Sequence, residues 1–354
     1  MAAVRANAMT NLPALQKFCD GVNRLKNEFP GTTTTDLSIP GTTRKVSTYD
    51  LFVVWHNLAM NTFTPPTQGD RNAAHRGPVF LPWHRFMLRQ LELNLQRVLQ
   101  DANAGLPYWD WAADGDRPAN QQTQSPLWDA AHIGGSGTVS TGPFAFSASN
   151  PQSFHLRIDS DSNGSVRQVN RDLRRALGQS PGIALPTSVQ AKAAVNVTPY
   201  DVSPWATAST GFRNQVEGWR PSPPGLHNRV HVWVGGDMSP ATSPNDPVFF
   251  LNHCNVDRLW ESASPLSAIN RRSVSQRADR LNGGTVRVLI PSRRRTILAG
   301  LYGTISTLAK FHRSLVGAVS FNCTLVPTFG TAAFCLCTQR VSRATVSTHW
   351  CTIV

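Results

Sequence analysis

The chain has 354 residues, of which 40% are hydrophobic and 16% charged, and it is long enough to bury a full globular core. Its ten Trp and 16 Phe exclude a chain that is disordered throughout, because disordered chains lack so many apolar anchors. No apolar run approaches the ~20 residues that span a bilayer, and no secretory signal is visible near the N-terminus. We therefore expect no membrane partner.

The formal net charge of +13 suggests an anionic partner such as nucleic acid, but the charge is unevenly distributed. Residues 1–262 hold 22 basic and 20 acidic side chains, a net charge of +2, whereas residues 263–354 hold 12 basic side chains and one acid, a net charge of +11. Nine of the ten Trp also precede residue 262. We therefore expect a nearly neutral domain over 1–262, a basic tail of unknown fold over 263–354, and no nucleic-acid partner.

The hydrophobic pattern predicts five main helices in the first segment. Apolar residues recur at helical spacing over 11–28, 48–60, about 82–98, 226–234 and 246–261. A further short helix is predicted over 169–177, within a region from 112 to 210 that is rich in Gly, Ser, Pro and Asn. The predicted fold is mainly α, with a four-helix-bundle core whose long loops build a site.

Six of the ten histidines fall into two groups of three on these helices and their loops: His56, His75 and His84, then His227, His231 and His253. Side chains four residues apart project from the same face of a helix, so His227 and His231 are expected to point in the same direction. A single buried His is more often a hydrogen-bonded core residue than a ligand. Burying six without partners, however, would cost ~1–3 kcal/mol each, so a shared ligand is the better explanation.

The ligand type points to a metal. Neutral imidazole suits Zn, Cu, Fe and Ni, and the zinc-protease motif is absent because Asn228 follows His227 where that motif needs Glu. Two sets of three His, with no carboxylate or Cys offered as a further ligand, favour two copper ions that each keep an open position for O2.

Four longer segments extend this pattern: His75–His84 (HRGPVFLPWH), Pro107–Trp111 (PYWDW), Leu226–Gly236 (LHNRVHVWVGG) and Ser243–Trp260 (SPNDPVFFLNHCNVDRLW). Together they resemble the tyrosinase family of type 3 copper proteins over roughly residues 4 to 261. The resemblance implies that the first three His bind one copper (Cu A), that the second three bind the other (Cu B), and that a four-helix core surrounds the pair. It also implies that O2, bound side-on as peroxide between the coppers, oxidises monophenols and o-diphenols to o-quinones.

The resemblance also suggests a general base. A phenol must lose its proton before oxidation, and its unperturbed pKa is near ~10. Glu217 matches the glutamate that holds a basic water in the family, and Asn228 matches its asparagine partner. Their joint presence is typical of members with monophenolase activity.

Three further residues are candidates for positions close to the ligands. Phe249 matches a family phenylalanine that packs beside a ligand imidazole. Asp257, one turn after His253, is expected to orient an imidazole or to pair with Arg229, and the alternative is an ordinary ion pair of the helix. Asn252 stands where many members have His, and we expect it to hydrogen-bond near the site and to alter substrate choice.

The residues that depart from the family pattern leave alternatives open. Ala73 replaces the Cys that forms a thioether in many plant and fungal members, so this chain resembles bacterial members. Residues 220–225 form a Pro-rich loop that we expect to line the entrance. The alternatives to a phenol oxidase are an o-aminophenol oxidase of secondary metabolism, haemocyanin-like O2 binding, and an inactive remnant.

Partners and location follow from the same reasoning. We expect a small phenolic substrate, O2, and a helper protein that delivers copper. Without a signal peptide the default location is cytoplasmic, with export alongside the helper as the alternative. Cys19 and Cys254 support no disulfide framework.

Residues 263–354 match no part of the resemblance. Three interpretations are a lid over the copper site, a basic binding segment, and out-of-frame translation, of which we favour the last because composition and motif change at one point. A strand over 286–290 and a helix or strand over 296–309 are predicted there, and Cys335 and Cys337 form a Cys-x-Cys pair that is more often incidental than metal-binding.

Overall fold

A computed structural model describes residues 5–64, 70–161, 163–219 and 225–263, together with the backbone of three strands nearer the C-terminus. The chain divides into two compact units, Met1–Val286 and Arg287–Val354, which we describe separately. In the described part of the chain, no helix is both long enough and apolar enough to cross a bilayer.

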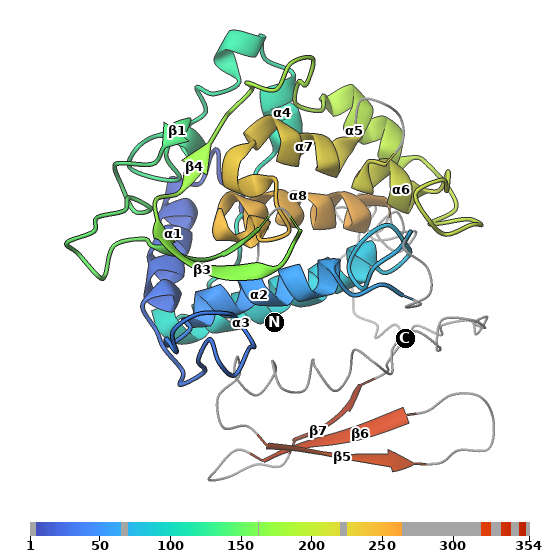
Figure 1. Ribbon diagram of the computed structural model, residues 1–354. Helices are drawn as coiled ribbons and strands as arrows, with labels where there is room; N and C mark the ends of the chain where they lie inside the picture. Colours follow the sequence, from blue (N-terminus) through green and yellow to red (C-terminus); the bar gives the residue numbers. More distant parts are fainter. Residues whose placement is uncertain are drawn as a thin grey trace, which may run out of the picture. The chain divides into compact units, whose positions relative to one another are not determined.

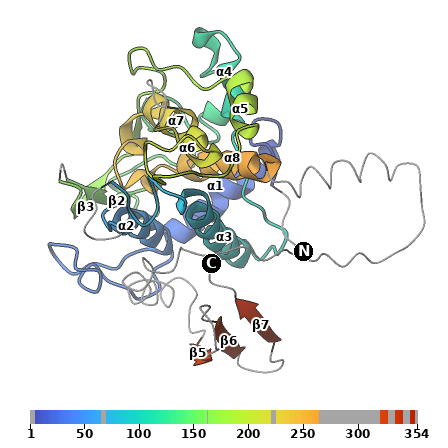
Figure 2. The ribbon, with the colours of Figure 1, turned by 90° about the vertical axis from the view of Figure 1, so that its right-hand side faces the viewer.

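Four helices of the first unit carry five of the six predicted ligands. They are α2 (Thr48–Met60), α3 (Phe80–Leu99), α7 (Leu226–Val234) and α8 (Val248–Ala263). Figures 1 and 2 show α7 and α8 on one side of the core and α2 and α3 on the other. The predicted helical core is confirmed. The predicted bounds of α2 and α7 agree with the structure, whereas α3 begins at Phe80, two residues before the predicted start.

Local signals explain where these helices begin. The side chain of Ser47 accepts a hydrogen bond from the backbone N–H of Asp50, an N-terminal cap for α2. Helix α1 (Leu12–Lys26) is capped in the same way by Asn11, and it buries Leu15, Phe18 and Val22 on one face. Helix α1 contacts both α2 and α3, so it forms an outer wall of the bundle.

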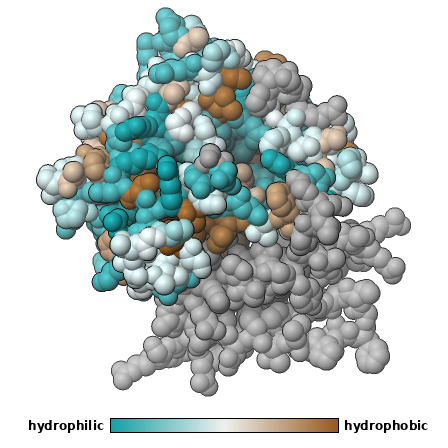
Figure 3. All heavy atoms as spheres, in the orientation of Figure 1, coloured by the Kyte–Doolittle hydropathy of each residue, from teal (hydrophilic) through white to brown (hydrophobic). Residues whose placement is uncertain are grey.

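The remaining elements of the first unit lie in the loops. They are the helices α4 (Trp111–Gly115), α5 (Ser188–Val195) and α6 (Phe212–Glu217), the 3-10 turns η1 (Ala119–Gln121), η2 (Pro126–Trp128), η3 (Gly236–Met238) and η4 (Ser243–Asn245), and the strands β1 (Gly137–Thr138), β2 (Leu156–Ser160), β3 (Val166–Arg171) and β4 (Arg174–Arg175). Strand β2 pairs with β3 and strand β1 with β4, both antiparallel. The described surface seen in Figure 3 is mostly hydrophilic, with small apolar patches.

The helix predicted over 169–177 was wrong. This segment contains the end of β3, all of β4 and the turn that joins them. Leu173 and Leu177 are four residues apart and both are buried, which imitates a helical face. The backbone instead pairs β3 with β2 in a hairpin and β4 with the more distant β1, and such pairing is not encoded in local helical periodicity.

The second unit contains a three-stranded antiparallel sheet in the order β5 (Ser320–Val326), β6 (Phe334–Arg340) and β7 (Ser347–Cys351). The segments predicted over 286–290 and 296–309 lie outside the described residues. The Cys335 and Cys337 pair belongs to β6, where only the backbone is described.

Candidate metal centre

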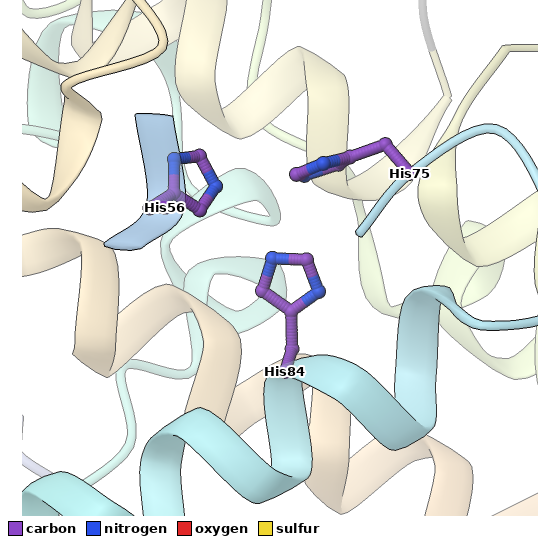
Figure 4. A group of neighbouring side chains, drawn as sticks. All are labelled: His56, His75 and His84. Carbon is purple, nitrogen blue, oxygen red and sulfur yellow. The ribbon is translucent and has the colours of Figure 1, made fainter. Parts of the chain in front are cut away.

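The first three histidines converge on one point. His56 comes from α2, His84 from α3, and His75 from the loop between these helices. One ring nitrogen from each lies within 4.8 Å of the other two, and Figure 4 shows the three rings facing a common space. The prediction that these residues meet is confirmed.

The second three histidines form a matching group. His227 and His231 lie one turn apart on α7, and His253 lies on α8; one nitrogen of each is again within 4.8 Å of the others. The rings of His84 and His253 stack with centroids 4.1 Å apart. The two groups are therefore adjacent.

Hydrogen bonds orient three of the rings. The Nδ1 atoms of His56, His84 and His231 lie 2.7, 2.8 and 2.7 Å from the backbone oxygens of Ala241, Phe80 and Met238. A carbonyl can only accept, so each Nδ1 carries the proton and donates it. Each Nε2 then presents a lone pair, and all three Nε2 atoms are buried without a hydrogen-bond partner. This is the pattern by which proteins fix imidazole ligands of a metal.

Burial keeps the imidazoles neutral. Removal from water lowers the pKa of His56 to about 3 and that of His231 to about 4, and it holds the pKa values of the other four well below the usual value. The Nε2 atoms of His227 and His253 face one another at 3.1 Å. Neutral imidazole nitrogens that converge on one space suit copper, so the residues fit two copper ions.

One short loop supplies an acceptor for a ligand of each group. Residues 235–242 contain both Met238 and Ala241, whose carbonyls hold His231 and His56. The loop follows a tight backbone path: Gly236 has a φ of +52°, and a Cβ there would lie 2.2 Å from the backbone oxygen of Arg174. Only glycine is compatible with this approach.

Strand β3 holds this loop through an ion pair between Arg171 and Asp237. Asp237 accepts hydrogen bonds from Nη2 and Nη1 of Arg171 at 2.6 and 3.0 Å and from the backbone N–H of Arg174 at 2.8 Å. The other anchor is Asp159 on β2, which accepts from Arg171 at 2.7 Å and from the hydroxyl of Thr242 at 3.2 Å. The β2–β3 hairpin thus positions the loop that orients His56 and His231.

Glu217 and Asn228 lie on either side of His227. Nδ1 of His227 is 3.0 Å from Oδ1 of Asn228 and 3.3 Å from the backbone oxygen of Glu217. The Glu217 carboxylate is fully buried and accepts from the backbone N–H of Arg76 at 2.6 Å and from Nη1 of Arg213 at 2.9 Å. Burial raises the pKa of Glu217, an effect that Arg213 opposes.

Phe249 packs among the ligands as expected. Its ring centroid is 4.2 Å from that of His253 and 4.9 Å from that of His56. Asn252 is fully buried, and neither its amide nitrogen nor its amide oxygen has a hydrogen-bond partner. The expected hydrogen bond of Asn252 is therefore not found in the described part of the chain.

Asp257 neither orients a ligand imidazole nor pairs with Arg229, and the alternative of an ordinary ion pair agrees with the structure. Its carboxylate pairs with Arg5 and Arg85 at 2.5 Å, not with a ligand imidazole or with Arg229. Asp257 occupies the side of α8 that meets the N-terminal segment and α3, whereas Arg229 bonds to Gln190. Helical spacing alone did not show that two distant arginines compete for this carboxylate.

A cavity of about 450 Å³ opens over the histidines. Its lining residues are His56, Met60, His75, Arg76, Gly218, Trp219, His227, Asn228, His231, Val232, Ser239, Pro240 and Ser243. Sequence reasoning missed Arg76 and Trp219, although each lies within two residues of a residue it had selected. Residues 220–224 of the loop expected at the entrance lie outside the described residues.

Two adjacent groups of three neutral histidines, five of them buried, on a helical core define a dicopper protein of the type 3 class. The family model for the common central domain of tyrosinase matches residues 46–262. The chain therefore belongs to the tyrosinase family, whose members oxidise phenols.

Several similar relatives are bacterial. The chain is 43% identical to a tyrosinase of Streptomyces antibioticus over 223 residues, which covers 61% of this chain and 72% of that protein. It is 38% identical to grixazone synthase of Streptomyces griseus over 236 residues, covering 60% of this chain and 73% of that protein. Among solved structures, a latent aurone synthase (polyphenol oxidase) shares 18% identity at a TM-score of 0.45, over 75% of this chain and 48% of that chain.

Proposed function

We propose that this protein is a tyrosinase that oxidises monophenols and o-diphenols to o-quinones with O2. The observation that carries this proposal is the pair of three-histidine groups beneath one cavity of about 450 Å³. When bound there by the six histidines, two copper ions supply the binding and reduction of O2. The cavity is large enough for one small phenol, which it places against His56, His75, His227 and His231.

The protein's own groups supply the proton acceptor in this proposal. We propose that Glu217 and Asn228 hold a water molecule beside His227 that takes the phenolic proton and passes it to the Glu217 carboxylate. Burial supports this role because it raises the pKa of Glu217, and a carboxylate with a raised pKa accepts a proton more readily. The backbone N–H of Arg76 and the guanidinium of Arg213 hold the carboxylate in place.

The test follows a monophenol and its catechol in the same copper-loaded sample. We expect two coppers per chain and quinone formation from both 4-methylphenol and 4-methylcatechol. Glu217→Gln should lower monophenol turnover by about 100-fold, the lower range for a general base, and should change catechol turnover by only a few-fold. Glu261→Gln, at an exposed position on α8 that pairs with Arg85, is the matched control and should behave as the parent.

Each other outcome rejects a part of the proposal. Equal losses for both substrates in Glu217→Gln would assign Glu217 a structural role. Reversible O2 uptake without quinone formation would favour an oxygen carrier, and neither uptake nor turnover would favour an inactive remnant.

A second candidate substrate class is the o-aminophenols. The observation that favours it is Asn252, whose buried amide stands beside His253 and has no hydrogen-bond partner. Turnover of 2-aminophenol well above that of 4-methylcatechol would support this alternative.

We also propose that a helper protein delivers the copper. Five of the six ligand histidines are buried, and His231 is half-buried, and the cavity lined by four of them is the route to the donor nitrogens that the described residues show. Rapid and complete loading from a weak copper chelate in the absence of any other protein would contradict this proposal.

A further inference from the structure

The described wall of the cavity over the histidines carries a positive charge and no negative one. Arg76 is its one charged lining residue among those the structure describes, and no Asp or Glu lines it. Among the described residues, the Arg76 guanidinium is therefore the protein's only charged group at the cavity wall, and it adds to the positive charge that bound copper supplies there.

The backbone of Arg76 is held in an unusual conformation. Its φ is +64°, a left-handed value that is uncommon for residues other than glycine and that costs of order 1 kcal/mol. The backbone N–H of Arg76 donates to Oε1 of Glu217 at 2.6 Å, and this bond stabilises the turn. A glycine would adopt the same turn without strain, so the backbone alone does not require arginine here.

The side chain of Arg76 is held at the cavity wall. Its guanidinium lies 4.8 Å from the ring centroid of Trp219, and the Trp219 side chain is itself hydrogen-bonded to Glu217. Over the described residues, no carboxylate forms an ion pair with Arg76, since the nearby Glu217 side chain is paired with Arg213. Stacking on an aromatic ring leaves the guanidinium edge free to donate hydrogen bonds.

We propose that Arg76 is a specificity-determining residue that selects phenols carrying a carboxylate on the ring substituent. This inference rests on the proposed function. A guanidinium binds a carboxylate through two parallel hydrogen bonds, and it repels an ammonium group at the same position. The Trp219 face beneath it orients the guanidinium and excludes water from one side.

The experiment compares three substrates of one shape and different charge: 3-(4-hydroxyphenyl)propionate, 4-ethylphenol and tyramine. We expect Arg76→Gln to lower kcat/KM for the propionate about tenfold, as the loss of a charge-assisted hydrogen bond at a half-exposed site predicts. The test is the ratio of kcat/KM values: the preference for the propionate over 4-ethylphenol should fall by about this factor, and the preference for tyramine over 4-ethylphenol should rise. Added salt should raise KM for the propionate more in the parent than in the variant.

Two further variants separate charge from structure. Arg76→Lys keeps the charge and loses the planar fork, so it should recover part of the propionate selectivity. Arg44→Gln removes an exposed arginine that does not line this cavity and should change none of the three ratios. Equal losses for all three substrates in Arg76→Gln, or no change in their ratios, would overturn the inference.

The two proposals fail separately. If 4-ethylphenol is not oxidised, the proposed function fails, while calorimetric binding of the propionate and of 4-ethylphenol to the copper-loaded protein still tests Arg76. A propionate affinity that is no higher than that of 4-ethylphenol, or that Arg76→Gln leaves unchanged, would reject the role of Arg76.

Discussion

Removal of the Asp237 carboxylate should weaken both copper sites, although Asp237 contacts no ligand. In Asp237→Ala the loop 235–242 loses its anchor to Arg171 and to the backbone of Arg174. The carbonyls of Met238 and Ala241, which orient one histidine of each group, then lose their fixed position. One substitution therefore acts on two metal ions.

The magnitude follows from the contacts that are lost. Breaking a fully buried ion pair costs ~3–5 kcal/mol, but the Arg171 side chain is 26% exposed and keeps Asp159 at 2.7 Å. We therefore expect the free energy of unfolding of the copper-free protein to fall by about 2 kcal/mol. Copper affinity should fall about tenfold at each site, the lower range for changes in groups that orient ligands.

The assay is a competitive titration with a copper chelator, performed where the variant is folded, together with urea unfolding of the copper-free protein. Asp172→Ala removes an acid in the turn between β3 and β4 that pairs with the exposed Arg174 side chain and serves as the control. Parent-like copper affinity at both sites in Asp237→Ala would refute the proposed coupling. A loss at one site alone would show that the loop holds only one ligand.

Two further predictions concern the core. Phe249→Ala should lower the free energy of unfolding by about 3–5 kcal/mol and weaken copper binding, because the ring packs against both His56 and His253. Calorimetric unfolding with and without copper measures both effects. A loss of stability below about 1 kcal/mol would contradict this prediction. Burial raises the pKa of Asp114 to about 6, so the folded state holds its proton more tightly than the unfolded state, and the native stability falls as pH rises from about 4 to about 6. Asp114→Asn keeps an acceptor for the Trp109 indole but carries no charge. It should be more stable than the parent by about 1–3 kcal/mol at pH 8 and equally stable at pH 4. Urea unfolding at the two pH values measures this difference, and an equal effect at both would refute the expected titration of Asp114.

Helices with strong periodicity were predictable from the sequence. The bounds of α2 and α7 agree with the prediction, and the six histidines meet in the two groups that were expected. Both results have the same physical origin, since residues three and four apart share a helix face and an apolar face must be buried. The family motifs lie on these same helices, so local pattern and resemblance lead to one conclusion.

The sequence by itself therefore determined the ligand set, the helical core and the family. Only the tertiary structure decided what surrounds them: which carbonyls orient His56 and His231, that Asp257 pairs with Arg5 and Arg85, and that Arg76 stacks on Trp219. The physical reason is that these contacts join residues far apart in the chain, where several partners of suitable charge exist. Spacing limits the choice to a helix face, and packing selects one partner.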